Sequence, residues 1–247
     1  MEAYTEISFL QNGNMTWIFK AKDITSRDVV FKVFFPRYIA NIIFKYERRI
    51  LLKITSIPQV QKYIDDFAIP TETLNTLLPN FKNSLSEGEF ILDKCLVLVM
   101  EFAPGMDLFE SLKAKIPVPI NLFFQTMTQI LSDLHQNRIQ HRDIKMENIV
   151  YDPNTKQFTL IDFGSAGSST DLQSDKVYVC LTHGYYKIPR DNYSEKFQDN
   201  YAVMVCLYEL IHNHSPWNNL DGSYLGWENQ TILTYQEIVE KYLTEKS

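Results

Sequence analysis

The sequence has 247 residues, of which 45% are apolar and 13% aromatic, and its formal net charge is −6. This length and composition predict a globular protein of one large domain or two lobes and exclude an intrinsically disordered chain. No apolar run approaches the roughly 18 residues of a membrane span. The first residues, MEAYTEIS, do not have the pattern of a signal peptide. We therefore expect no association with a membrane.

Charge and cysteine content indicate which partners and which cellular compartment suit the protein. The acidic balance argues against a DNA-binding surface and is compatible with a basic partner, although solubility alone also explains it. The three cysteines, Cys95, Cys180 and Cys206, are few, odd in number and scattered. They predict free thiols in a reducing compartment, so we expect an intracellular protein of the cytoplasm or nucleus.

The first part of the chain has the pattern of β-strands. Three runs rich in β-branched and aromatic residues, separated by the turn signals QNGN and DITSRD, are ISFL (7–10), TWIFKA (16–21) and VVFKVFF (29–35). A helix is predicted from Arg37 to Ile54. Residues 70–90 have the composition of a loop, with two prolines and three asparagines. The continuous apolar run at 94–102 is typical of a buried strand.

After Pro104-Gly105 the patterns become mostly helical. Helices are predicted at 107–115, 120–138, 199–211 and 234–246, and short strands at 148–151 and 158–163. No internal repeat is present. The sequence thus predicts an α+β fold with a strand-rich part at 1–100 and a mostly helical part at 101–247.

The run HRDIKMEN, residues 141–148, concentrates ionisable and carboxamide side chains directly after a predicted apolar-faced helix. Asn148 precedes Asp162 by 14 residues, and the segment between them has the pattern of a hairpin. Because a hairpin brings its ends together, Asp143, Asn148 and Asp162 are expected to converge. Oxygen ligands of this kind suit Mg²⁺, and a separate Asp can orient a hydroxyl nucleophile. The alternative is a capped turn beside a solvated hairpin.

A second pair of charges lies upstream in apolar surroundings. Lys32 stands within the strand pattern VVFKVF, where charged residues are rarely left unpaired. Glu47 falls on the same face of the predicted helix as Ile43 and Ile50. We therefore expect a Lys32–Glu47 ion pair, whose role is either catalytic or only structural.

Together these motifs resemble those of eukaryotic-type protein serine/threonine kinases, over about residues 7–217. The matching segments are VFKV for the ATP-binding Lys, ERRIL for its Glu partner, MEF (100–102) for the hinge, HRDIKMEN for the catalytic loop and DFG (162–164) for the metal motif. The compact size resembles the short kinases of large DNA viruses such as baculoviruses and granuloviruses. The resemblance implies a bilobal fold with a β-rich N-lobe and a mostly helical, shortened C-lobe.

The resemblance also implies roles for individual residues. Asp143 would accept the proton of the substrate hydroxyl, and Lys145 would neutralise charge on the transferred phosphoryl group. Asn148 and Asp162 would bind Mg²⁺, with Mn²⁺ as an alternative ion. The ATP-binding set would comprise Gly13, Ile18, Val30, Lys32, Glu47, Glu101, Ala103, Asp107 and Val150. Thr182 occupies the place where serine/threonine kinases have a Thr beside the catalytic Asp.

The sequence departs from the family pattern in two motifs. The glycine-loop pattern G-x-G-x-x-G falls on residues 11–16 and keeps only Gly13, so close approach of the backbone to phosphate is less favoured. The A-P-E motif reads IPR at 188–190, so Arg190 replaces its Glu. We expect the Arg that pairs with this Glu in the family to be missing as well, since only 30 residues follow Trp217. Both departures leave the catalytic set intact.

Two functions follow. The first is a protein kinase that transfers the ATP γ-phosphoryl group to Ser or Thr in basic protein substrates. The resemblance implies that Asp107, Glu147 and Glu209 would bind arginines of such a substrate. The alternative is a pseudokinase, acting as a binding or allosteric module. The damaged glycine loop favours the alternative, whereas the intact catalytic set favours the active enzyme.

Three further features have open alternatives. Ser and Thr residues at 168–174 are either regulatory phosphorylation sites or part of a solvated loop. His141 is expected to pack in the core, since none of the histidines has metal-ligand spacing. On the 37–54 helix, Ile39, Ile42 and Tyr46 extend the apolar stripe outside the inward face. Either a neighbouring segment covers this stripe, or a second copy of the chain or a regulatory protein binds it.

Overall fold

A computed structural model describes residues 3–13, 15–74, 92–167, 185, 195–214 and 216. The chain divides into two compact units, which are described separately. The first comprises Met1–Ser56 and Gln61–Ala103, and the second Ile57–Val60 and Pro104–Ser247. The division after Ala103 lies three residues beyond the boundary expected from the sequence. The α+β fold class is confirmed.

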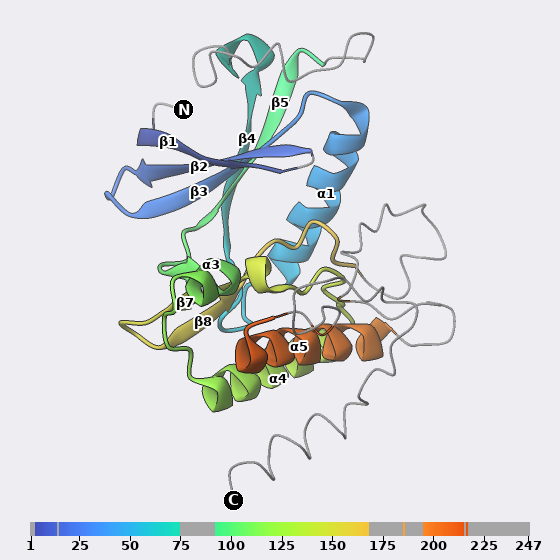
Figure 1. The fold of residues 1–247 in the computed structure, drawn as a ribbon. Helices are drawn as coiled ribbons and strands as arrows, with labels where there is room; N and C mark the ends of the chain where they lie inside the picture. The colour runs from blue at the N-terminus through green and yellow to red at the C-terminus, as the bar shows by residue number, and fades with distance from the viewer. Residues whose placement is uncertain are drawn as a thin grey trace, which may run out of the picture. The chain divides into compact units, whose positions relative to one another are not determined.

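The first unit is built on a five-stranded antiparallel sheet in the order β1-β2-β3-β5-β4 (Figure 1). The strands are β1 (Tyr4–Asn12), β2 (Thr16–Asp23), β3 (Asp28–Phe34), β4 (Tyr63–Pro70) and β5 (Lys94–Glu101). The strands β3 and β5 are buried over most of their length, as their apolar runs predict. The edge strand β1 is mostly exposed and carries two register shifts. All the strands predicted for this part of the chain are confirmed.

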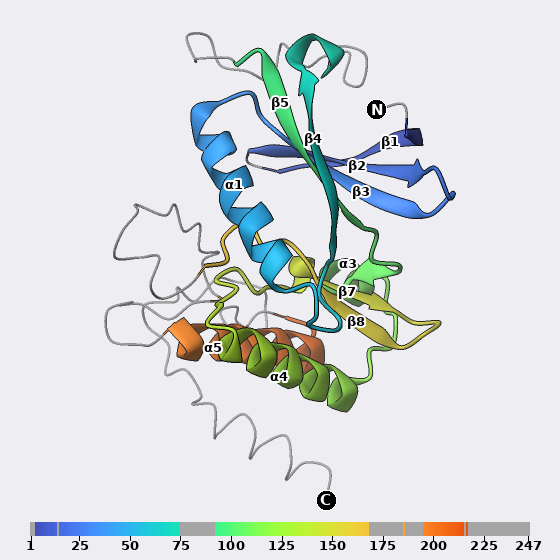
Figure 2. The ribbon, with the colours of Figure 1, turned by 180° about the vertical axis from the view of Figure 1, so that it is seen from behind.

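One long helix, α1 (Tyr38–Lys53), packs on β3, β4 and β5 (Figures 1 and 2). Its buried face contains Ala40, Phe44, Glu47, Ile50 and Leu51, so the predicted helix and most of its inward face are confirmed. A short 3-10 helix, η1 (Thr71–Thr73), follows β4. Most of the loop predicted at 70–90 lies outside the described residues.

The apolar stripe of α1 is less exposed than the sequence predicted. Ile39, Ile42 and Tyr46 are half-buried, and so is Ile43, which was expected on the inward face. Helix periodicity predicts the direction in which a side chain points from the helix axis. It does not predict how far the neighbouring strands extend around the helix and cover that side chain. The binding of a partner to this helix stays a prediction.

The second unit combines helices with a small sheet. Its helices are α3 (Leu108–Lys113), α4 (Ile120–Gln136) and α5 (Glu195–His212), and its sheet has the order β6 (Met106–Asp107), β7 (Ile149–Asp152), β8 (Gln157–Leu160). The 3-10 helix η3 (Met146–Asn148) leads into β7. α4 and α5 pack side by side (Figure 2). Ala202–Leu207 of α5 are all buried, which explains why this stretch of the helix is apolar on every side.

Local features explain where these elements begin. The Asp107 carboxylate accepts a hydrogen bond from the Glu110 amide at 2.8 Å and so caps α3. Gly105 has φ +110°, and a Cβ there would lie 2.2 Å from the Tyr151 carbonyl oxygen, so only glycine fits this turn. The hairpin predicted between Asn148 and Asp162 is confirmed as the β7–β8 pair.

Some predicted features fall outside the described residues. These are the helix at 234–246, the IPR motif, Thr182 and the Ser/Thr cluster at 168–174. In the part of the chain that the structure describes, no helix is long and apolar enough to cross a membrane.

Candidate active site

The loop that contains Asp143 is fixed by Asp199, a fully buried residue of α5. The Asp199 carboxylate accepts hydrogen bonds from the backbone amides of His141 and Arg142, each at 2.9 Å. A third contact, at 3.1 Å, joins the same carboxylate to Nε2 of His135 on α4. Arg142 has φ 65°, a left-handed conformation that needs support from its surroundings. Asp199 provides that support.

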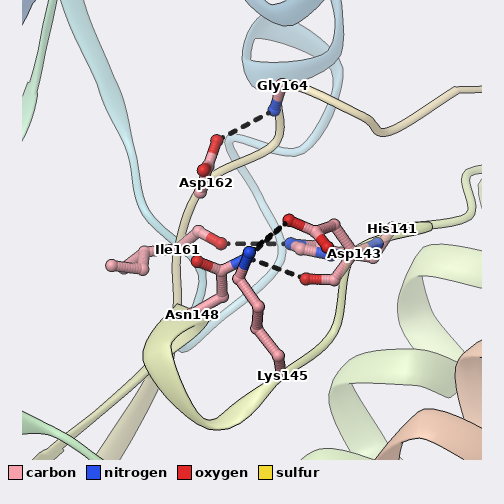
Figure 3. Close-up of polar contacts among 7 residues, drawn as sticks. All are labelled: His141, Asp143, Lys145, Asn148, Ile161, Asp162 and Gly164. Atoms are coloured by element: carbon pink, nitrogen blue, oxygen red, sulfur yellow. Dashed lines mark hydrogen bonds and ion pairs between the residues drawn. The ribbon is translucent and has the colours of Figure 1, made fainter. Parts of the chain in front are cut away.

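His141 links this loop to the end of the hairpin. Its Nδ1 accepts a hydrogen bond from the Asp143 amide at 3.3 Å, so Nε2 carries the proton and donates to the Ile161 carbonyl at 3.1 Å (Figure 3). The ring also packs edge-on against Phe163, with centroids 4.8 Å apart. His141 is fully buried. The prediction that it packs and hydrogen-bonds in the core is confirmed.

Asp143 is the centre of a short polar network (Figure 3). The side-chain nitrogen Nδ2 of Asn148 donates to the backbone carbonyl of Asp143 at 2.7 Å and to Oδ2 of the Asp143 carboxylate at 3.1 Å. Nζ of Lys145 donates to the same Oδ2 at 3.0 Å. Two donors on one oxygen fix the direction of the carboxylate, which is the preorganisation that a general base needs.

Asp162 approaches this network through the backbone. The Ile161 amide donates to the Asn148 carbonyl at 2.9 Å, so the chain entering Asp162 lies beside the catalytic loop. Asp162 has φ 60°, and its Oδ1 accepts from the Gly164 amide at 3.2 Å (Figure 3). The hairpin therefore brings the backbone at Asp162 beside Asn148, while the Asp162 carboxylate bonds to the Gly164 amide. Convergence of the side chains of Asp143, Asn148 and Asp162 stays a prediction.

The donor atoms fit a hard divalent cation. Both hydrogen bonds of the Asn148 side chain use its nitrogen, so its carboxamide oxygen points away from Asp143 towards the chain that carries Asp162 (Figure 3). An amide oxygen and a carboxylate suit Mg²⁺, which takes its remaining ligands from phosphates and water. Among the described residues, no group of three or more His, Cys, Asp or Glu forms a metal site.

In the first unit, Lys32 and Glu47 form the expected pair. Nζ of Lys32 lies 2.8 Å from Oε1 of Glu47, and both side chains are buried. Removing one partner of such a pair leaves an uncompensated charge, which typically costs about 3–5 kcal/mol. The ion pair therefore keeps the lysine ammonium in one position.

Strand register brings other predicted residues onto the face that carries Lys32. Ile18 lies directly opposite Lys32, and Val30 is two residues away along β3. All three side chains therefore point to the same face of the sheet. Gly13 lies in the exposed turn between β1 and β2, where its amide donates to the Thr16 carbonyl at 2.8 Å. Glu101 ends β5, and Ala103 is the last residue of this unit.

The remaining predicted residues belong to the second unit. Val150 is buried in β7 opposite Asp107, the cap of α3. Glu147 is exposed, and Oε2 of Glu209 accepts a hydrogen bond of 2.7 Å from the Tyr185 hydroxyl. Burial raises the pKa of Tyr185, and the negative charges of Glu209 and Glu147 raise it further. The hydrogen bond to Glu209 ties Tyr185 to α5.

Comparison with known proteins now identifies the family. The sequence matches the protein kinase domain over residues 4–246. The chain belongs to the protein kinase family. Curated relatives include serine/threonine-protein kinase 1 of Heliothis zea nuclear polyhedrosis virus, which is 30% identical over 132 residues, or 51% of this chain and 47% of the relative.

Relatives from other organisms have similar identity. Serine/threonine-protein kinase PrkC of Bacillus subtilis is 32% identical over 146 residues, which is 57% of this chain and 22% of that protein. Glycogen synthase kinase 1 of Pyricularia oryzae is 31% identical over 137 residues, which is 51% of this chain and 34% of that protein. The chain therefore spans less than half the length of these relatives. The resemblance to serine/threonine kinases, including a baculovirus enzyme, is confirmed, and so is the protein-kinase fold.

Sequence reasoning missed the residues that hold the kinase site in place. Asp199, the partner of the catalytic-loop amides, was one of several acids in the α5 segment. Gly167 exchanges two backbone hydrogen bonds with Gln140, which ties the chain after Asp162 to the chain before His141. A Cβ on Gly167 would lie 2.3 Å from Nη1 of Arg142, so the lack of a side chain there makes room for the guanidinium. The buried acid in an apolar helix was the one available signal.

Proposed function

We propose that this protein is an active serine/threonine kinase that transfers the γ-phosphoryl group of ATP to Ser or Thr hydroxyls of basic proteins. The observation that carries the proposal is the network around Asp143, in which Lys145 and Asn148 both donate to one carboxylate oxygen. A carboxylate held in this way can accept the proton of an incoming hydroxyl. The pattern of names among the relatives supports the same class of enzyme.

Each residue has a definite part in this proposal. Asp143 orients the hydroxyl and takes its proton, while the Lys145 ammonium, 3.0 Å from that carboxylate, offsets negative charge on the phosphoryl group. Lys32, held by Glu47, contacts the phosphates of the nucleotide. Asn148 and Asp162 would hold Mg²⁺, which when bound neutralises phosphate charge and orients the nucleotide.

A basic substrate is supported by Glu147 and Glu209. Glu147 is an exposed acid of the 141–148 loop, and Glu209 is a half-buried acid of α5, so the second unit has negative charge at both places. A guanidinium pairs with carboxylates through two parallel hydrogen bonds, so arginine fits such a location better than lysine does. We therefore propose arginine upstream of the acceptor residue.

A pseudokinase remains the second candidate because of the β1–β2 turn. The Gly13 amide bonds to the Thr16 carbonyl, and Thr16 is itself buried. This tight turn lacks the glycines that let a backbone approach phosphate closely. Weak nucleotide binding would favour a binding module over an enzyme.

Radiolabelled phosphate transfer to paired peptides tests the proposal. One peptide has arginines before its acceptor Ser, and the other has glutamates at the same positions. We expect transfer to the arginine peptide with ATP and Mg²⁺, and a reduced preference in Glu147→Gln. The control is Glu110→Gln, because Glu110 is an exposed acid that pairs with Lys113 at the surface. Nucleotide binding without any transfer would favour the pseudokinase.

A further inference from the structure

Two neighbouring residues of α1, Glu47 and Arg48, each form an ion pair with a different strand of the sheet. Glu47 contacts Lys32 of β3 at 2.8 Å, and Arg48 forms an ion pair with Asp66 of β4. Strand register places Lys32 opposite Leu98 of β5, and Leu98 opposite Asp66. Because directly opposed side chains point to the same face, these three residues form one transverse row under α1. Two strand spacings make this row about 10 Å long.

Asp66 is held from two directions at its end of the row. The same oxygen, Oδ1, contacts Nε of Arg48 and accepts a hydrogen bond from the Tyr63 hydroxyl. The Arg48 guanidinium also lies over the Tyr63 ring, 5.7 Å from its centroid. Tyr63 therefore directs the carboxylate towards the helix. We call this group of Arg48, Asp66 and Tyr63 the β4 clamp.

The β4 clamp is too exposed to be a major source of stability. The side chain of Arg48 is 42% exposed and that of Asp66 is 24% exposed. Ion pairs in such surroundings contribute little to the free energy of unfolding, because water screens them and two long side chains must be ordered. We therefore expect the clamp to affect the orientation of α1 more than the free energy of unfolding.

The β4 clamp can fix the rotation of α1 about its own axis. The apolar contacts of α1, such as those of Phe44 and Leu51, are non-directional and tolerate small rotations. The Glu47–Lys32 contact is a single point about which the helix can still turn. Successive residues of a helix project about 100° apart, so a contact at Arg48 as well fixes that rotation.

We propose that Arg48 and Asp66 are positioning residues that hold α1 in the rotation at which Glu47 meets Lys32. This inference rests on the proposed kinase function, in which Lys32 contacts the phosphates of ATP. Without the clamp, α1 turns, Glu47 moves away from Lys32, and the ammonium is no longer directed at the nucleotide.

The test compares Arg48→Ala with Arg49→Ala in the full chain. Arg49 is the adjacent exposed arginine, whose guanidinium lies 5.0 Å from the centroid of the Tyr46 ring, away from the clamp. We expect Arg48→Ala to raise KM for ATP roughly fivefold, within the range of couplings carried by packed networks. Its melting temperature should fall by less than about 2 °C. Arg49→Ala should change neither quantity.

Combination with Glu47→Gln separates positioning from general damage. If Arg48 acts through Glu47, then adding Arg48→Ala to Glu47→Gln should raise KM for ATP no further. Asp66→Ala should reproduce Arg48→Ala, and the double variant of the two should be no worse than either. Arg48→Lys, which keeps the charge, should recover part of the loss.

Hydrogen exchange of the α1 amides gives a readout that does not need activity. We expect faster exchange around Glu47 in Arg48→Ala than in Arg49→Ala. Equal exchange in these two variants, or additive effects in the Glu47→Gln background, would overturn the clamp. A wild-type protein that transfers no phosphate would overturn the proposed function instead, and exchange would still decide the clamp.

Discussion

Replacing Asp199 with Asn tests how far the catalytic loop depends on one buried carboxylate. Oδ1 of Asp199 accepts from the Arg142 amide and Oδ2 from the His141 amide, each at 2.9 Å. A carboxamide has only one oxygen, so in either orientation one of the two buried amides loses its acceptor and faces an NH₂ group. A hydrogen bond to a charged group contributes about 1.5–3 kcal/mol. We expect the free energy of unfolding to fall by about 2–3 kcal/mol.

This loss should appear in two assays. For a chain of this length, about 1 kcal/mol shifts the melting temperature by about 2–4 °C, so thermal unfolding should occur roughly 5–10 °C lower. Phosphate transfer should fall more than tenfold, since small displacements of a catalytic group are costly. The control is Asp133→Asn on α4, where, among the described residues, the acid accepts an exposed hydrogen bond from Gln129. If Asp199→Asn unfolded and reacted like this control, the anchoring role derived for Asp199 would be refuted.

Three further predictions concern the catalytic base, a buried thiol and the surface of α1. Asp143→Ala should lower turnover by roughly 10²-fold or more with the fold intact, and near-normal phosphate transfer by this variant would contradict the kinase proposal. Burial raises the pKa of Cys95 to about 11, so this thiol stays protonated at pH 8. Mass spectrometry should find Cys95 unalkylated after the folded protein is treated with iodoacetamide. Rapid labelling of Cys95 would contradict its burial. If a second copy of the chain binds α1, Ile42→Glu should weaken self-association in light scattering and lower activity, whereas a monomeric, fully active wild type would rule out the dimer.

The sequence by itself determined most of the secondary structure and the candidate reactive residues, whereas the strand β4 was not predicted. Alternating and continuous apolar runs predicted β2, β3 and β5, because side-chain period and burial are local properties of a strand. The clustering of charged residues in HRDIKMEN predicted a site, since a core does not otherwise collect such groups. The Lys32–Glu47 pair followed from two charges on apolar faces, each of which required a partner.

Only the tertiary structure decided what holds these residues in place. Asp199 bonds to an amide 58 positions earlier in the chain, and no local period relates those two places. The row of Lys32, Leu98 and Asp66 depends on strand order, which places β5 between β3 and β4. Contacts of this kind arise from how the strands pair and how the helices pack. A single sequence therefore shows which groups can react but not which distant residues position them.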